Sequence, residues 1–218
     1  MLRNRQINAV IFDLDGVIVQ SERVSWKTWL DFISGFGKEM GEEDFRRLIG
    51  SHNSPESIRE ILDLPMSAEE IYEDHQRRLL EAVEQGMPVT DGINALLADL
   101  SARSIPMAVA SNSARRYVLR ILELTEMEKY FRAVVTRDDV SNPKPAPDIY
   151  LEAASRLDVP AEECMAIEDS PIGLESALAA DMLCIAVPNP DLREMGFERA
   201  QFRFETIDSL HKALNMLL

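Results

Sequence analysis

Residues 7–21 read INAVIFDLDGVIVQS, and this stretch decides how the rest of the chain is interpreted. Residues 9–12 form a short apolar run with two β-branched members, which predicts a strand buried on both faces. Asp13 and Asp15 follow at once, and Gly16 comes next. Two close carboxylates repel each other unless a cation shares the site, so the pair suggests a hard metal ion such as Mg²⁺. The alternative is an Asp-Gly turn with two solvated acids, and this stretch alone does not choose between them.

Size, charge and cysteine content limit the possible functions. The 218 residues suffice for one large domain, or for a core domain with a smaller insert, and 46% of them are apolar. The net charge of -15 argues against nucleic acid or an anionic membrane surface as a partner. Cys164 and Cys184 each lie in a short apolar run, so we expect reduced core thiols in a cytoplasmic protein. No apolar run has a membrane-spanning length, and a monomer is the default expectation.

The pattern along the chain changes twice. Between about residues 21 and 85 only helical periodicity is found, and it predicts helices over 21–37, 42–49, 54–64 and 67–85. Beyond Pro88, helices alternate with apolar strands. The predicted helices cover 91–103, 113–124, 147–157, 171–180 and 207–218, and the predicted strands cover 106–110, 133–136, 164–167, 182–187 and 202–204.

Helix-strand alternation of this kind predicts an α/β fold with a doubly wound parallel sheet. The helical block then becomes an insertion after the first strand. We therefore expect a core domain over 1–19 and 87–218 and an α-helical cap domain over 20–86. A helical insert at the ligand end of a sheet can act as a lid.

Three later strand ends also carry polar groups. Ser111 and Asn112 precede a helix, where a hydroxyl beside backbone amides suits an anion, although a plain N-cap at Ser111 or Ser113 is the alternative. Lys144 stands between prolines that fix the backbone, or it is an incidental lysine in a stiff linker.

The fourth strand end has two adjacent acids, Glu168 and Asp169, before Ser170 and Pro171. An N-cap would explain one of these residues but not both acids, which favours metal ligation. Taken together, acids, a fixed cation and anion donors at four strand ends predict a phosphoryl-transfer site.

Four segments of the chain resemble, in order, the four motifs of the haloacid dehalogenase-like (HAD) phosphatase superfamily. They are Asp13-Leu14-Asp15-Gly16-Val17, Ser111-Asn112, Lys144-Pro145 and Glu168-Asp169-Ser170. The resemblance extends over the whole chain, because the helical insert is similar to that family's small α-helical cap. It implies a Rossmann-like core and Mg²⁺ as the cofactor.

The resemblance also implies roles for single residues. Asp13 would be the nucleophile that forms an aspartyl-phosphate, and Asp15 would be the general acid and then the general base. The phosphoryl group would be bound by Ser111, Asn112, Lys144 and Gly16. Mg²⁺ would be held by Asp13, the backbone carbonyl of Asp15, Asp169 and Glu168, the last through water or by orienting the site.

The insert also resembles that of β-phosphoglucomutase and its phosphatase relatives, at residues 47–50 and 61–64. The mutases place a His near Ser25 and an Arg near Asn53 or Ser54, and neither is present here. His52 does not replace a bidentate Arg. We therefore expect a phosphatase acting on a small phosphorylated metabolite, a sugar phosphate first of all, with a β-phosphoglucomutase-type mutase as the alternative.

A rival of another class is a non-catalytic phosphoacceptor or binding module. Receiver domains also use acids, a Ser or Thr and a Lys on a doubly wound sheet. They have no helical insert after strand one, so the insert argues against them. Whether four arginines contact a substrate stays open from the sequence: Arg77, Arg78, Arg115 and Arg116.

Overall fold

The computed structural model describes residues 6–41, 59–60, 63–188 and 196–218. The chain divides into two compact units, one formed by residues 1–20 and 88–218 and the other by residues 21–87. None of the described helices is both long and apolar enough to cross a membrane.

The first unit is built on a parallel sheet of six strands in the order β3-β2-β1-β4-β5-β6. This arrangement confirms the predicted α/β class and its doubly wound, Rossmann-like sheet. The strands are β1 (Ala9–Phe12), β2 (Met107–Ser111), β3 (Ala133–Thr136), β4 (Cys164–Glu168), β5 (Leu183–Ala186) and β6 (Phe202–Arg203).

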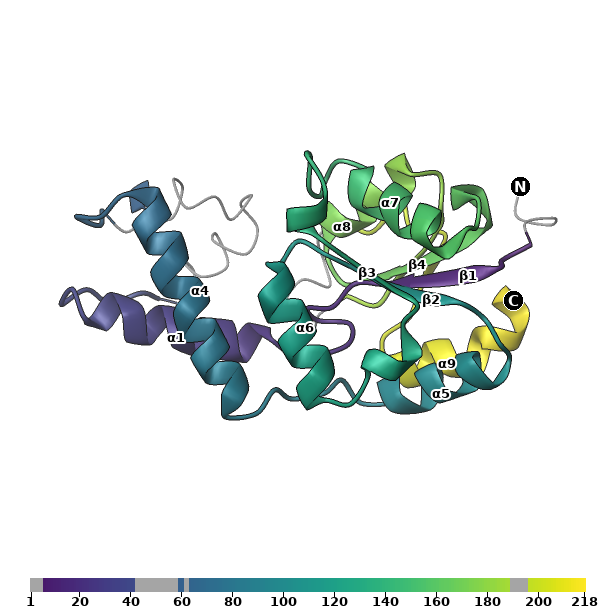
Figure 1. Ribbon diagram of the computed structural model, residues 1–218, viewed down its shortest axis with the longest axis horizontal. Helices are drawn as coiled ribbons and strands as arrows, with labels where there is room; N and C mark the ends of the chain where they lie inside the picture. The colour runs from purple at the N-terminus through teal and green to yellow at the C-terminus, as the bar shows by residue number, and fades with distance from the viewer. Residues whose placement is uncertain (1–5, 42–58, 61–62, 189–195) are drawn as a thin grey trace. The chain divides into compact units, whose positions relative to one another are not determined.

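Helices cover both faces of this sheet. Figure 1 shows α7 and α8 on one side of the strands and α5 and α9 on the other. α7 contacts β1, β2 and β3, and α8 contacts β4 and β5. Their bounds are α5 (Ile93–Ala102), α6 (Arg115–Leu124), α7 (Asp148–Leu157), α8 (Pro171–Ala179) and α9 (Ile207–Leu217), with 3-10 turns at Glu128–Tyr130, Arg137–Asp139 and Ala161–Glu163. The sequence predicted these five α-helices and the six strands to within two residues at each end, but not the 3-10 turns.

The parallel sheet explains why the polar strand ends meet. β1 pairs with β2 on one side and with β4 on the other, and Phe12 lies opposite Val109 and Ile167. Ser111 is the last residue of β2 and Glu168 the last of β4, while Asp13 directly follows β1. Because parallel strands present their carboxyl ends at one edge, these three residues lie together there.

The second unit is helical in its described part. α1 (Glu22–Ser34) packs against α4 (Ala68–Glu84). α4 begins with a capping box at Ser67: the Ser67 hydroxyl accepts from the Glu70 backbone N–H at 3.2 Å, and the Glu70 carboxylate accepts from the Ser67 N–H at 2.8 Å. The predicted helices over 42–49 and 54–64 fall wholly or mostly outside the described residues.

His75 is buried in this helical unit and is uncharged there. Its ring stacks on Trp29 with centroids 3.8 Å apart and planes 13° apart. The Thr28 hydroxyl donates to the Ser25 carbonyl at 2.7 Å, so its oxygen is open to accept from His75 Nε2, 3.4 Å away. Burial lowers the pKa of His75 to about 3. Charging this imidazole therefore opposes the packing of α1 on α4.

We expect the helical unit to lose stability in mild acid because of His75. Between about pH 6.5 and pH 3 the unfolded chain binds a proton at this residue and the folded chain does not. The free energy of unfolding should therefore fall by up to about 1.4 kcal/mol per pH unit below pH 6.5. Urea unfolding at pH 7, 6, 5 and 4, followed by the fluorescence of Trp26 and Trp29, measures this slope.

His75→Phe should flatten the slope, because Phe keeps a ring against Trp29 and does not titrate. His211→Gln is the matched control, since His211 lies on α9 in the other unit, against Asp99. An unchanged slope in His75→Phe would contradict the assignment.

Candidate active site

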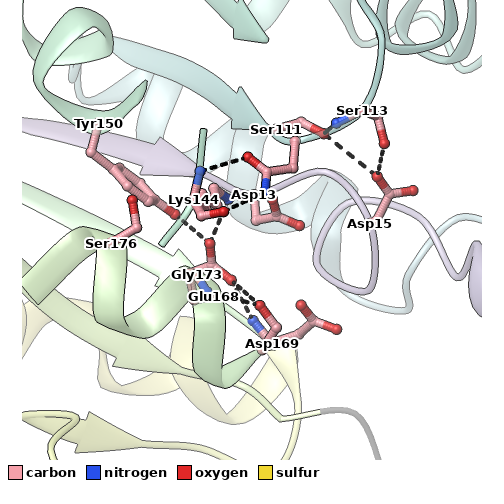
Figure 2. A network of polar contacts seen from close by, with 12 residues as sticks. Asp13, Asp15, Ser111, Ser113, Lys144, Tyr150, Glu168, Asp169, Gly173 and Ser176 are labelled. Carbon is pink, nitrogen blue, oxygen red and sulfur yellow. Dashed lines mark hydrogen bonds and ion pairs between the residues drawn. The ribbon is translucent and has the colours of Figure 1, made fainter. Parts of the chain in front are cut away.

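Three buried carboxylates lie together at the carboxyl ends of β1 and β4. One carboxylate oxygen from each of Asp13, Glu168 and Asp169 lies within 4.8 Å of the others, and all three side chains are buried. Figure 2 shows these residues converging from the two strands. The structure thus brings together acids that are more than 150 residues apart in the sequence.

Lys144 reaches into this cluster from the loop that follows β3. Its Nζ lies 2.6 Å from Asp13 Oδ1 and 2.6 Å from Glu168 Oε1, and the residue is only 8% exposed. Burial alone would lower the pKa of Lys144, but the two carboxylates outweigh burial and raise the pKa above its ordinary value. Lys144 is therefore a fixed ammonium between two acids, which an incidental linker lysine would not be.

The cluster has more negative charge than Lys144 can balance. Burial, together with the carboxylates of Glu168 and Asp15, outweighs Lys144 and raises the pKa of Asp13 to about 8. A second cation would restore the carboxylate form of Asp13, and buried oxygen ligands are those that hard divalent ions take. The residues present therefore fit a divalent metal ion, with Asp13, Glu168 and Asp169 as the side chains able to hold it.

Gly16 allows the chain to turn close to this cluster. Its φ is +82°, in the left-handed region that favours glycine. A Cβ built at Gly16 would overlap the carboxylate of Asp169. The absence of a side chain at Gly16 therefore leaves room for Asp169.

Asp15 is oriented by a different set of groups. Its carboxylate accepts hydrogen bonds from Ser113 Oγ at 2.7 Å, from the Tyr117 hydroxyl at 3.1 Å and from Ser111 Oγ at 3.5 Å. Its side chain is not one of the three clustered carboxylates, and the predicted metal contact of Asp15 concerned its backbone carbonyl instead. The structure thus gives Asp13 and Asp15 different surroundings.

Neither serine at the start of α6 is its N-cap. The cap position is Ala114, without a side-chain hydrogen bond, whereas the alternative from the sequence had been a cap at Ser111 or Ser113. Ser113 instead bonds Asp15, and its backbone N–H donates to Ser111 Oγ at 3.1 Å. Tyr117 was not predicted from the sequence, where its position on a helix beside the site was the only signal.

Asn112 holds the backbone of Lys144 from both sides. Asn112 Nδ2 donates to the Lys144 carbonyl at 3.0 Å, and the Lys144 N–H donates to Asn112 Oδ1 at 2.9 Å. A carboxamide offers both a donor and an acceptor, so a single side chain can fix the main chain in this way. Asn112 thereby joins the end of β2 to the loop after β3.

After β4, the N-cap of the next helix is Ser170 and not either of the two acids. Ser170 is the N-cap of α8 and its Oγ accepts from the Gly173 N–H at 3.1 Å, with Pro171 as the first helical residue. The cap alternative therefore accounts for Ser170 and leaves Glu168 and Asp169 facing the site.

Three of the four arginines left open by the sequence bond to acids of their own unit. Arg78 Nε lies 2.6 Å from Asp74, which also pairs with Arg77. Arg115 lies 3.0 Å from Asp139 in the other unit. Arg77 and Arg78 therefore form ion pairs within α4, and Arg115 forms one at the start of α6.

Comparison with known proteins places the chain among hydrolases. Residues 10–187 match the family described as haloacid dehalogenase-like hydrolase. The chain is 31% identical over 180 residues to the phosphorylated carbohydrates phosphatase of Thermotoga maritima, which covers 80% of this chain and 82% of that protein. It is also 34% identical over 193 residues to the protein SUPPRESSOR OF QUENCHING 1, chloroplastic, of Arabidopsis thaliana. That match covers 84% of this chain but only 18% of the longer plant protein.

A solved structure shares the whole fold. A mutant of CbbY from Rhodobacter sphaeroides in complex with xylulose-(1,5)bisphosphate superposes with a TM-score of 0.84 at 26% identity. The superposition covers 94% of this chain and 96% of that one.

We expect Gly16→Ala to weaken the binding of divalent cations. The new methyl group would displace the Asp169 carboxylate, and the left-handed backbone at residue 16 would be strained as well. A ligand that binds the folded state raises the unfolding temperature, so the rise caused by Mg²⁺ should be smaller in the variant than in the wild type.

Gly37→Ala is the matched control for backbone strain. Gly37 has a φ of +66°, and a Cβ there meets nothing within 4 Å. This control should lose stability while keeping the full response to Mg²⁺. Equal responses in the wild type and Gly16→Ala would contradict the role given to Asp169.

Proposed function

The chain belongs to the haloacid dehalogenase-like hydrolase family, and from this premise we propose that it is a Mg²⁺-dependent phosphatase of small phosphorylated metabolites. The observation that carries the proposal is the placement of Lys144 against Asp13 beside two further buried acids. A phosphoryl-transfer site needs a nucleophile, a fixed cation and ligands for a metal ion in one place.

In the proposed reaction, Asp13 attacks the phosphorus of the substrate. A bond forms between an Asp13 oxygen and phosphorus while the bond from phosphorus to the leaving oxygen breaks, which gives an aspartyl-phosphate. Asp15 in its acid form donates the proton that the leaving oxygen needs. Asp15 then takes a proton from water, whose oxygen attacks phosphorus, releases inorganic phosphate and regenerates Asp13.

The hydrogen bonds of Asp15 support its proposed role in proton transfer. Ser113 and Tyr117 bond its two carboxylate oxygens from α6 or just before it, so the side chain is oriented separately from Asp13. Two carboxylates that differ in surroundings can do different work, one as a nucleophile and one in proton transfer.

Charge on the transferred phosphoryl group would be balanced by Lys144 and the metal ion. Asp13, Asp169 and the backbone carbonyl of Asp15 are the groups proposed to hold Mg²⁺, with Glu168 acting through water or by orienting the site. When bound, this ion would neutralise charge on the phosphoryl oxygens. The protein's own net charge of -15 makes such local cations necessary for an anionic substrate.

Three further groups complete the proposed phosphate site. Ser111 lies at the end of β2 and its hydroxyl is near Asp15, which supports a place for it beside the phosphoryl group. The Gly16 N–H donates to the Val19 carbonyl at 2.7 Å, so a contact between Gly16 and phosphate stays a prediction. The contacts of Asn112 support a positioning part, since its amide bonds the Lys144 backbone, and its direct contact with phosphate stays a prediction.

The helical unit is proposed to serve as a cap that supplies substrate specificity. The similarity to a phosphatase of phosphorylated carbohydrates, and to a structure holding a sugar bisphosphate, supports a sugar phosphate as the substrate class. Hydrolysis is preferred to mutase activity because the sequence lacks both the His that the mutases place near Ser25 and their Arg near Asn53 or Ser54. A panel of phosphorylated sugars, assayed with and without Mg²⁺, would identify the substrate.

Asp13→Asn should abolish phosphate release while leaving the fold intact. The amide is nearly the same size but cannot serve as the nucleophile, so turnover should fall by more than about a thousandfold, beyond the loss of a single hydrogen-bond donor. A colorimetric phosphate assay with an aryl phosphate measures this. Asp31→Asn, on the exposed face of α1, is the matched control and should retain activity. Turnover at the wild-type rate in Asp13→Asn would exclude Asp13 as the nucleophile.

Removal of divalent cations should stop the reaction reversibly. Treatment with EDTA is expected to suppress aryl phosphate hydrolysis, because the buried acids would then lack the cation that balances them. Addition of excess Mg²⁺ should restore the initial rate, whereas Na⁺ at the same ionic strength should not. Undiminished activity in EDTA would rule out a metal requirement.

A further inference from the structure

We propose that Tyr150 is a positioning residue that keeps Lys144 on Asp13 by acting through Glu168. The effect of Tyr150 on turnover rests on the proposed phosphatase function. Its effect on the position of Lys144 does not, and can be measured in the protein without metal or substrate.

Tyr150 contacts both partners of this arrangement. It lies on α7 and is completely buried, and its hydroxyl donates to Glu168 Oε1 at 2.6 Å. The face of its ring lies 5.0 Å from Lys144 Nζ, within the range of a cation–π contact. Figure 2 shows Tyr150 on the opposite side of Lys144 and Glu168 from Asp15.

The hydroxyl of Tyr150 is not needed for packing. α7 has other buried, apolar residues that pack it in the core: Ile149, Ala153, Ala154 and Leu157. A phenylalanine would supply the same ring without a polar group to satisfy. A buried hydroxyl is costly unless it is bonded, and here its partner is a carboxylate of the candidate site.

All four acceptor positions of Glu168 are in use. Oε1 accepts from Lys144 and Tyr150, each at 2.6 Å. Oε2 accepts from the Asp169 N–H and from Ser170 Oγ, each at 3.2 Å. A carboxylate has about four lone-pair positions, so no further donor is needed to satisfy it.

The backbone of α8 also limits how far the Glu168 carboxylate can turn. A Cβ built at Gly173 would overlap its oxygens, which shows how closely α8 approaches. Because the carboxylate is confined, a change in its donors must be met by movement of those donors. Among these donors, Lys144 is the one whose movement affects a second acid, because it bonds Asp13 as well as Glu168.

Tyr150 therefore determines how the Lys144 ammonium is shared between Asp13 and Glu168. Donation from the phenol reduces the negative charge that Glu168 Oε1 presents to Lys144, and this leaves more of the ammonium for Asp13. Without the hydroxyl, Lys144 should move toward Glu168 and away from Asp13. The proposed nucleophile would then lose the cation that holds its reacting oxygens in place.

The first experiment measures Lys144 directly. In the metal-free protein labelled with ¹⁵N-lysine, a buried, ion-paired ammonium gives an Nζ resonance, which Lys144→Gln assigns by removing it. Tyr150→Phe should shift this resonance. Tyr130→Phe, which removes a phenol from a partly exposed position in the same unit, should not. An unshifted Lys144 resonance in Tyr150→Phe would overturn the proposal, whatever the activity of the protein.

The second experiment measures turnover. Tyr150→Phe should lower kcat for an aryl phosphate by about 10- to 100-fold, the usual effect of losing a residue that orients a metal or catalytic ligand. KM should change less than about twofold, because substrate contacts are untouched, and Tyr130→Phe should leave both constants unchanged. A kcat within twofold of the wild type would overturn the proposal.

A double variant distinguishes action through Glu168 from a general loss of structure. If Tyr150 works through Glu168, adding Tyr150→Phe to Glu168→Gln should lower kcat little further. Full additivity of the two losses would overturn the proposal. Should Tyr150→Phe fail to fold, the ¹³Cζ resonance of Tyr150 in Glu168→Gln gives the same information: a shift supports the contact, and no shift refutes it. If the wild type releases no phosphate, the proposed function fails while both resonance tests still stand.

Discussion

The structure of this site depends on one buried ammonium shared between two carboxylates. Lys144 bonds Asp13 and Glu168 at equal distances, with Asp169 close by. A buried charge is tolerated only when it is paired, so each member of the cluster depends on the others being present. The burial that raises the pKa of Asp13 also creates the demand for a further cation. The same constraint thus links the packing of the core to the chemistry proposed for it.

Three of the charged groups are held by neighbours that carry no charge of their own. Asn112 fixes the backbone of Lys144, Tyr150 bonds Glu168, and Ser113 with Tyr117 orients Asp15. These contacts tie α6, α7 and the loop after β3 to the ends of β1, β2 and β4. A phosphoryl-transfer site depends on positioning more than on reactive groups, so such supporting contacts matter for its rate.

Much of the site was predicted from the sequence, because its charged members fall directly after apolar runs. The strand ends at Asp13, Ser111 and Glu168 were recognisable from the runs before them, and the loop lysine from its prolines. Tyr150 and Tyr117 were not recognisable, because an aromatic residue on the buried face of a helix has the same pattern whether or not its hydroxyl is used. The hydrogen bond from Ser113 to Asp15 was not predicted either, because a serine before a helix is usually its N-cap.

The sequence by itself determined the order of helices and strands, the parallel sheet and the four polar segments, because hydrophobic periodicity and chain order are local properties. Only the tertiary structure decided which donor meets which acceptor. Lys144 and Asp13 are 131 residues apart, and Asp15 and Ser113 are 98 apart. Hydrogen bonds of about 3 Å between such residues depend on strand register and on how closely helices approach, which no local pattern specifies. Register and close packing therefore convert a list of polar residues into a site with two differently placed aspartates and one shared lysine.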